Sequence, residues 1–399
     1  MERTSLWRHF DYVLLVVTIL LTAYGVLMIY SANLGSLDAD LSFLWQRQAT
    51  FGVIGIGLIF LLAIFPRDYA WLGDFWWLIF LLAAALLVLA LLFGQSEVGE
   101  IRSWIQLGGF NFQPSFLSMN LLAISVGAIL SRRRKKRRLH RPPLFGAPKT
   151  SLLAEEVAER PDVMNYLASI FMTLTLAALI FLAPDMGTAA VLVFMWGLML
   201  FESDIPLKYL ILTIVVGVVS IYPMWQLAEA LDFHYMQDRI WGFIDPGSNE
   251  NVRYQLEQAA IAIGSGGFWG KGIGQGTQSQ LRYLPVRHTD FIFSVMAEEL
   301  GFAGVILLFG LYLLLFVRLL RIIIIASDTF GRLLVTGTLA MILCQIIINV
   351  GMNLGMLPVV GLPLPLISYG PAALLTTMVG IGLAESVAMR HQRAEFRGG

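Results

Sequence analysis

Long runs of uncharged, mostly apolar residues dominate the chain and are separated by short charged segments. A helix needs roughly 20 such residues to cross the hydrocarbon core of a bilayer. The runs are 12–37, 48–66, 75–96, 103–131, 163–184, 186–201, 209–228, one entered from Asp290 that includes 301–317, and 333–384, which is long enough for two helices. The pattern therefore predicts ten membrane-spanning helices.

The predicted architecture is an all-α polytopic membrane protein with a single transmembrane domain over residues 1–399. A closed barrel is rejected, because the apolar runs are continuous rather than alternating strands of about ten residues. A long exterior loop, about 229–289, separates predicted helices 7 and 8. Between helices 9 and 10, the Pro/Gly-rich segment 353–370 should be broken or re-entrant, which lipid tolerates only inside protein or beside water.

Composition supports a membrane protein and excludes a soluble or disordered one. Charged residues make up 14% of the chain, against about 25% in typical soluble domains. Hydrophobic residues make up 57%, and the mean hydropathy is +0.74. The single cysteine, Cys344, excludes an internal disulfide framework and a multi-cysteine metal site.

The basic residues are distributed unevenly between the two predicted sides. Seven of the 27 Lys and Arg residues fall in predicted exterior segments: Arg47, Arg102, Arg239, Arg253, Lys271, Arg282 and Arg287. The positive-inside rule therefore places both termini and the basic loop 132–162 in the cytoplasm. We expect the run RRRKKRR in this loop to fix topology and contact anionic lipid head groups, with no nucleic acid as partner.

The exterior loop contains a glycine-rich segment, with seven glycines between Gly264 and Gly276. Glycine allows close backbone approach to a ligand, and Lys271 adds a positive charge, so a diphosphate cradle is one interpretation. The alternative is a loop that packs tightly on the membrane face.

Several acidic residues lie at or within apolar runs. Asp290 precedes the eighth predicted helix, with Ser294 and Glu298 on the same helical face and Glu298 about 12 Å further down. Glu298 and its neighbour Glu299 must therefore face a partner or a cavity. Asp290 has two open interpretations, a helix N-cap or a chemical role, and Asp185 in APDMGTAA has the same two.

Seven segments carry a family resemblance, and together they extend over nearly the whole chain. They are RSWIQLG, QPS, APDMGTA, RIWGFIDP, QAAIAIGSGGFWGKGIGQGTQSQL, RHTDFIFSVMAEELGFAG and NVGMNLGMLPVVGLPLPLISYG. The chain resembles the SEDS (shape, elongation, division and sporulation) glycosyltransferases. GTQSQ, and Arg287 before HTDFIF, are similar to the elongation branch of that family.

The resemblance implies polymerisation of lipid II into glycan strands at the outer face of the bacterial cytoplasmic membrane during cell elongation. It also implies a class B penicillin-binding protein as partner and an essential aspartate at the position of Asp290. We assign Asp290 as the general base, since a positioned carboxylate can accept the proton of an attacking sugar hydroxyl. A divalent cation, Mg²⁺ or Mn²⁺, near Asp290 is a further candidate, although no metal-ligand spacing indicates one.

Other polar residues of these segments are candidates for substrate binding. Cations suited to balancing the leaving diphosphate are Arg102, Arg253, Lys271 and Arg287. Further candidates, each of which has loop or helix hydrogen bonding as its alternative, are Gln113, Ser115, Asp185, Gln278, Gln280, His288, Ser294, Glu298 and Ser368.

The sequence departs from the family pattern after QPS. Phe116 and Met119 stand where the family usually has Glu and, three residues later, Lys. Loss of both charges leaves no unpaired charge behind, so we expect activity to be retained.

Two other functions compete with the enzyme. A lipid-linked precursor flippase would also use intramembrane carboxylates and broken helices, but it needs access from both faces. A non-catalytic membrane scaffold for a penicillin-binding protein would not depend on Asp290.

Overall fold

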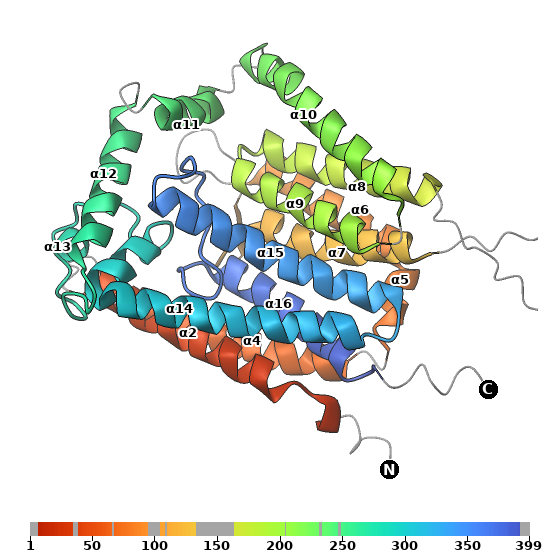
Figure 1. Cartoon of the computed structure of the whole chain (residues 1–399), viewed down its shortest axis with the longest axis horizontal. Helices are drawn as coiled ribbons and strands as arrows, with labels where there is room; N and C mark the ends of the chain where they lie inside the picture. The colour runs from red at the N-terminus through yellow and green to blue at the C-terminus, as the bar shows by residue number, and fades with distance from the viewer. Residues whose placement is uncertain are drawn as a thin grey trace, which may run out of the picture.

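The structure, a computed structural model, describes residues 7–34, 39–65, 68–94, 104–107, 110–132, 163–203, 205–230, 234–245 and 249–391. Within these described residues, ten long helices form a bundle (Figure 1). They are α2 (Tyr12–Ala32), α4 (Leu44–Ile64), α6 (Trp76–Phe93), α7 (Pro114–Ser131), α8 (Val163–Leu182), α9 (Met186–Glu202), α10 (Leu207–Ala230), α14 (Ile292–Ile325), α15 (Thr329–Asn353) and α16 (Pro371–Ala388). Each coincides with one of the predicted apolar runs.

Eight of these helices are long and apolar enough to cross a membrane: α2, α4, α6, α7, α8, α14, α15 and α16. Helix α9 and the Lys208–Ser220 part of α10 are shorter apolar segments. A membrane-spanning helical bundle is therefore confirmed within the described residues, and the total of ten spans stays a prediction.

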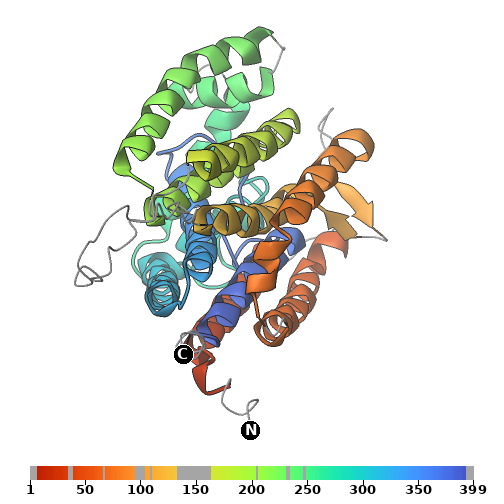
Figure 2. The same ribbon diagram turned by 90° about the vertical axis from the view of Figure 1, so that its right-hand side faces the viewer.

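The core of the bundle consists of α7, α15 and α16. Within the apolar window of α15, 83% of residues are buried by protein, against 17% for α6 at the edge. Helix α15 packs against α7, α9, α14 and α16, and α4 packs against α16 (Figures 1 and 2). Lipid must cover the apolar side chains of the outer helices.

The start of α2 and the end of α16 lie at the same end of the bundle (Figure 1). The Asp11 amide, just before α2, donates to the Glu385 carboxylate near the end of α16 at 3.0 Å. Asp11 also pairs with Arg318, towards the end of α14, at 2.6 Å. These contacts place the start of α14, and Asp290 before it, at the opposite end.

Residues 354–370, between α15 and α16, form no helix; residues 354–356 are exposed, whereas residues 364–368 are buried. Side chains of the surrounding helices satisfy their backbone carbonyls: Asn349 donates to Leu362 O at 2.7 Å and Tyr312 to Pro365 O at 2.6 Å. The predicted broken segment is thus confirmed, with irregular backbone enclosed by protein as a bilayer requires.

The predicted exterior loop 229–289 contains short helices beyond the end of the bundle, opposite the termini (Figure 1). They are α11 (His234–Ile244), α12 (Glu250–Ser265) and α13 (Thr277–Gln280). The remaining short elements are η1 (Trp7–His9), α3 (Ala39–Ser42), α5 (Ala70–Asp74) and an antiparallel hairpin of β1 (Ile105–Leu107) and β2 (Phe110–Phe112). The basic loop beyond Arg132, up to residue 162, lies outside the described residues.

Candidate active site

Asp290 lies in the turn just before α14 and does not cap that helix. The N-cap position is Phe291, and no side chain makes a capping hydrogen bond there. The Asp290 side chain instead lies close to Gly361 and Arg239: a Cβ atom added to Gly361 would lie 3.5 Å from Asp290 Oδ2 and 3.6 Å from Arg239 Nη1. Gly361 has φ +71, a conformation that favours glycine, and this lets the irregular segment approach the carboxylate closely.

Two asparagines hold the backbone of Asp290. Asn349 and Asn353, one turn apart on α15, donate from their Nδ2 atoms to the Asp290 carbonyl at 3.0 and 2.9 Å. Asn349 also donates to Leu362 O, which ties α15 to the irregular segment. The catalytic candidate is therefore fixed by its main chain, and the residue is only partly buried.

Two predicted site residues, Ser294 and Ser368, also help to hold the backbone around Asp290. Ser294 Oγ donates to Asn353 Oδ1 at 2.6 Å. Ser368 Oγ donates to Thr289 O at 2.6 Å and accepts from the Leu364 amide at 2.7 Å. Both serines thus position the backbone around Asp290.

Electrostatics at Asp290 favour a carboxyl that titrates near neutrality. Burial raises the pKa of Asp290 to about 6, against an opposing effect of the Arg239 charge. Arg239 comes from α11, and its Nη1 donates to Val359 O at 2.9 Å, next to Gly361. A residue used as a general base works best with a pKa near the operating pH.

His288 and Arg287 precede Asp290 and are held by neighbouring segments. The Tyr369 amide donates to His288 O at 2.9 Å, and the two rings meet edge to face at 5.9 Å. Burial, and then the Arg287 charge, lowers the pKa of His288 to about 4, so its ring is neutral at pH 7. Arg287 is buried, and its Nε donates to Ala32 O at the end of α2 at 2.6 Å.

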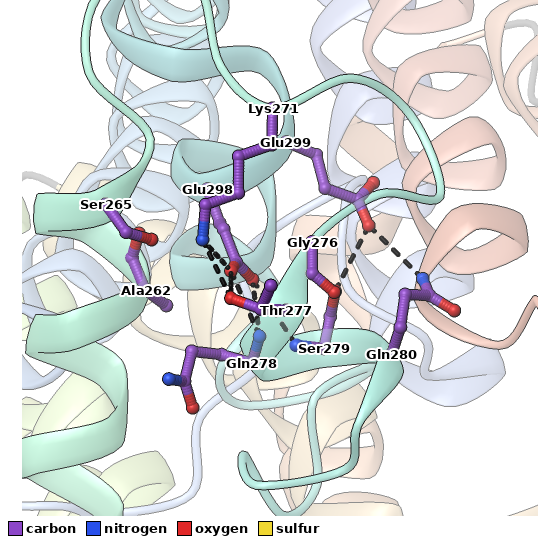
Figure 3. A network of polar contacts seen from close by, with 10 residues as sticks. All are labelled: Ala262, Ser265, Lys271, Gly276, Thr277, Gln278, Ser279, Gln280, Glu298 and Glu299. Atoms are coloured by element: carbon purple, nitrogen blue, oxygen red, sulfur yellow. Dashed lines mark hydrogen bonds and ion pairs between the residues drawn. The ribbon is translucent and has the colours of Figure 1, made fainter.

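The glycine-rich segment folds around Glu298 (Figure 3). The Glu298 carboxylate accepts from Lys271 Nζ at 2.7 Å, from Thr277 Oγ1 at 2.9 Å, and from the amides of Gln278 and Ser279. The Lys271 ammonium, expected to bind a diphosphate, therefore already pairs with an anion of the chain itself. Substrate contacts by Lys271 and Gln278 stay a prediction.

Glu299 contacts both α13 and α2. Its carboxylate accepts from Ser279 Oγ at 3.2 Å and from Gln280 Nε2 at 3.3 Å (Figure 3). It also accepts from Ser31 Oγ, near the end of α2. Both Glu298 and Glu299 are fully buried, so the prediction that each faces a partner is confirmed.

Asp185 gathers two other predicted residues, Gln113 and Ser115, at the start of α9. It caps α9 by accepting from the Thr188 amide at 3.0 Å. Gln113 Nε2 and Ser115 Oγ, at the start of α7, donate to its other oxygen at 2.9 and 3.0 Å. Burial raises the pKa of Asp185, against these hydrogen bonds. The capping interpretation therefore holds for Asp185.

Arg253, another predicted cation, has a carboxylate partner of its own. Arg253 is exposed on α12, where it pairs with Glu257 at 3.5 Å. Arg102 lies outside the described residues. Phe116 and Met119 are buried in apolar surroundings, which accommodate the departure from the family's charged pair.

Sequence reasoning missed Arg239, Asn349, Asn353 and Gly361. The two asparagines, spaced four residues apart in an apolar span, carried a signal, because buried amides there require partners. Among the described residues, no group of three or more His, Cys, Asp or Glu side chains could hold a metal ion.

Comparison with known proteins identifies the family. The profile of the FtsW, RodA and SpoVE cell cycle proteins matches residues 11–393. The peptidoglycan glycosyltransferase MrdB of Escherichia coli K12 is 36% identical over 95% of this chain and 93% of its own length. The peptidoglycan glycosyltransferase RodA of Treponema pallidum is 28% identical over 96% of this chain and 98% of its own.

Comparison with solved structures points to the same family. A chain of a peptidoglycan synthase complex that coordinates polymerization and crosslinking superposes with a TM-score of 0.73 and 27% identity, covering 96% of this chain and 99% of the other. RodA of Thermus thermophilus gives a TM-score of 0.65 and 28% identity over 96% and 97% of the two chains. The chain belongs to the cell cycle protein family of FtsW, RodA and SpoVE.

Proposed function

We propose that this chain is a peptidoglycan glycosyltransferase of the elongation type, which polymerises lipid II into glycan strands with Asp290 as general base. Family membership and the activity named for its relatives support the reaction class. The observation that carries the residue assignment is the Asp290 carboxylate, which leaves its helix uncapped and lies beside Arg239.

In the proposed step, a sugar hydroxyl attacks the anomeric carbon of a second saccharide that carries a lipid diphosphate. A glycosidic C–O bond forms, the C–O bond to the diphosphate breaks, and the hydroxyl proton moves to an oxygen of Asp290. With a pKa of about 6, this carboxyl is mostly ionised at pH 7 and still basic enough to accept the proton.

The surrounding residues hold the base in place. Asn349 and Asn353 donate hydrogen bonds to the Asp290 carbonyl, and Ser294 donates a hydrogen bond to Asn353. Such preorganisation matters because a misplacement of about 1 Å can lower a rate about 100-fold.

Charge on the leaving diphosphate needs cations or amide donors. Of the cations near the base, Arg239 is the best placed, because its guanidinium lies next to the carboxylate. Lys271 has a carboxylate partner of its own, and Arg253 lies apart on α12. A divalent cation at Asp290 would take substrate phosphate oxygens for much of its coordination, as Mg²⁺ commonly does.

We also propose that Asp290 faces outward from the bacterial cytoplasmic membrane and that both termini are cytoplasmic. Support comes from the excess of Lys and Arg on the predicted inner side and from the position of the termini at the end of the bundle opposite α13. A class B penicillin-binding protein is the proposed partner, supported by the similarity to a synthase complex that combines polymerization with crosslinking.

The test uses the purified chain with its transpeptidase in liposomes, with lipid II supplied only on the Asp290 side. We expect glycan strands to form without translocation of the precursor. Translocation without polymer would instead establish a flippase, and polymer formed at the wild-type rate by an Asp290→Asn complex would establish a scaffold.

A further inference from the structure

One face of α14 is exposed and apolar from Phe302 to Ile324. The residues of this stripe recur at helical spacing and are between 40% and 81% exposed. They are Phe302, Ile306, Phe309, Leu313, Val317, Leu320 and Ile324. From Phe302 to Ile324 the helix rises about 33 Å, close to the roughly 30 Å of a hydrocarbon core. The stripe therefore has the length of one bilayer crossing.

The stripe ends abruptly at Phe302. Residues 291–299, at the start of α14, are all buried by protein. Gly301, directly before the stripe, has φ +66, which interrupts the helix. A Cβ atom there would lie 2.3 Å from the Gly270 amide nitrogen, so glycine is required for the close approach of the two segments. The boundary of the lipid-facing surface thus coincides with the contact between α14 and the glycine-rich segment.

Two aromatic residues lie at this boundary. Phe268 contacts the Phe302 ring at 6.0 Å and the Trp269 ring at 4.9 Å. Trp269 is 80% exposed, although it is flanked by backbone that is tightly fixed. The Phe302 and Ala303 amides donate to Gly267 O and Phe268 O at 2.9 and 3.0 Å.

A second set of contacts fixes the depth of this aromatic pair. The Lys271 and Gly272 amides donate to Glu298 O and Glu299 O at 3.0 and 2.9 Å. Together with the buried carboxylate contacts of Glu298 and Glu299 (Figure 3), they join the segment to the start of α14 at several points.

We propose that Phe268, Trp269 and Phe302 form an interfacial anchor that inserts into the head-group region of the leaflet on the Asp290 side. Aromatic side chains, tryptophan above all, concentrate at this depth, where an apolar ring meets a wet boundary. Asp290 lies at the same end of the bundle as this anchor, beside the ends of the membrane-spanning helices α4 and α15. The anchor would thereby set the height of the base above the lipid.

A depth measurement in vesicles of phosphatidylethanolamine and phosphatidylglycerol tests this anchor. The single cysteine, Cys344, is buried and is replaced by alanine, after which nitroxide labels are introduced one at a time by Trp269→Cys, Ile306→Cys or Glu257→Cys. Ile306 is one turn down the stripe, and Glu257 is exposed on α12. Site-specific labels are needed because ten tryptophans make intrinsic fluorescence unselective.

We expect the ratio of oxygen to nickel-chelate collision rates to be highest at position 306 and lowest at 257. The ratio at position 269 should lie between them and several-fold above that at 257. Equal ratios at 269 and 257 would show that the aromatic pair stands in water. Protection of position 269 from both reagents only when the transpeptidase is bound would show a protein contact instead. Either result overturns the anchor, and neither depends on the proposed reaction, because no substrate is present.

Discussion

Asp185 and Asp290 precede two helices of the same bundle, and only Asp185 caps its helix. Asp185 accepts from an amide of α9 and from two side chains of the α7 start, so both of its oxygens are engaged by the fold. Asp290 makes no capping bond, and its oxygen lies next to Arg239 instead. The same residue type therefore serves architecture at one helix start and remains available for chemistry at the other.

The difference arises from what surrounds each aspartate. At α14 the N-cap position falls on Phe291, and the asparagines of α15 take up the Asp290 backbone rather than its side chain. At α9 the aspartate is itself the N-cap. Because the fold supports Asp290 through its main chain, its carboxylate can change partners without loss of structure.

Removing the main-chain support should have the largest effect short of removing the base. Asn353→Ala takes away the Asp290 and Ser294 contacts, and we expect kcat for lipid II polymerisation to fall about tenfold or more with little change in KM. The matched control is Asn120→Ala, because Asn120 is equally buried and donates to Thr376 O, far along the chain from Asp290. Similar losses in both variants would reduce the role of Asn353 to general stability.

Removing the charge of Arg239 should change the pH dependence of polymerisation, with a several-fold change in rate at acidic pH. The ionised form of Asp290 is the active base, so activity should fall as the pH drops through about 6. Arg239 favours the ionised form, so Arg239→Gln should raise the pKa and move this acidic limb to higher pH. Rates measured at pH 6 and pH 8 should therefore differ more in the variant than in the wild type. If the acidic limb does not move, Arg239 does not influence the pKa of Asp290.

The smallest effect on activity is expected from a change at Asp185, which should mainly lower stability. Asp185→Ala removes a helix cap and leaves the Gln113 and Ser115 donors without their acceptor, which should cost about 2 kcal/mol. Thermal melting in detergent should show the loss, while the activity of the folded fraction stays within about twofold. A much larger loss of activity would mean that the start of α7 contributes to the reaction itself.

The positions of the described helices were predictable, because each apolar run is long and continuous and ends at charged residues. The broken segment was predictable from its prolines and glycines. The β1–β2 hairpin was missed, although Gly108-Gly109 between alternating residues is a hairpin signal.

The site was predictable only in part. Asp290 stood out as a carboxylate beside an apolar run, but its approach to Arg239 and Gly361 joins segments far apart in the chain, which no local pattern reveals. Lys271 was interpreted as a ligand because of its glycine neighbours, while its true partner, Glu298, lies on another helix. Residues that act through tertiary contacts cannot be recognised from their spacing in the sequence.

The most direct measurement compares Asp290→Asn with the wild type for polymerisation and melting in the same preparation. Asparagine preserves the shape of the side chain and removes the base. We predict that glycan synthesis falls at least about 100-fold while the melting temperature stays within about 1 °C, because the Asp290 side chain makes no capping bond and its carbonyl contacts are untouched. Polymer formation at the wild-type rate, or a loss of activity that merely follows a loss of folded protein, would contradict the account.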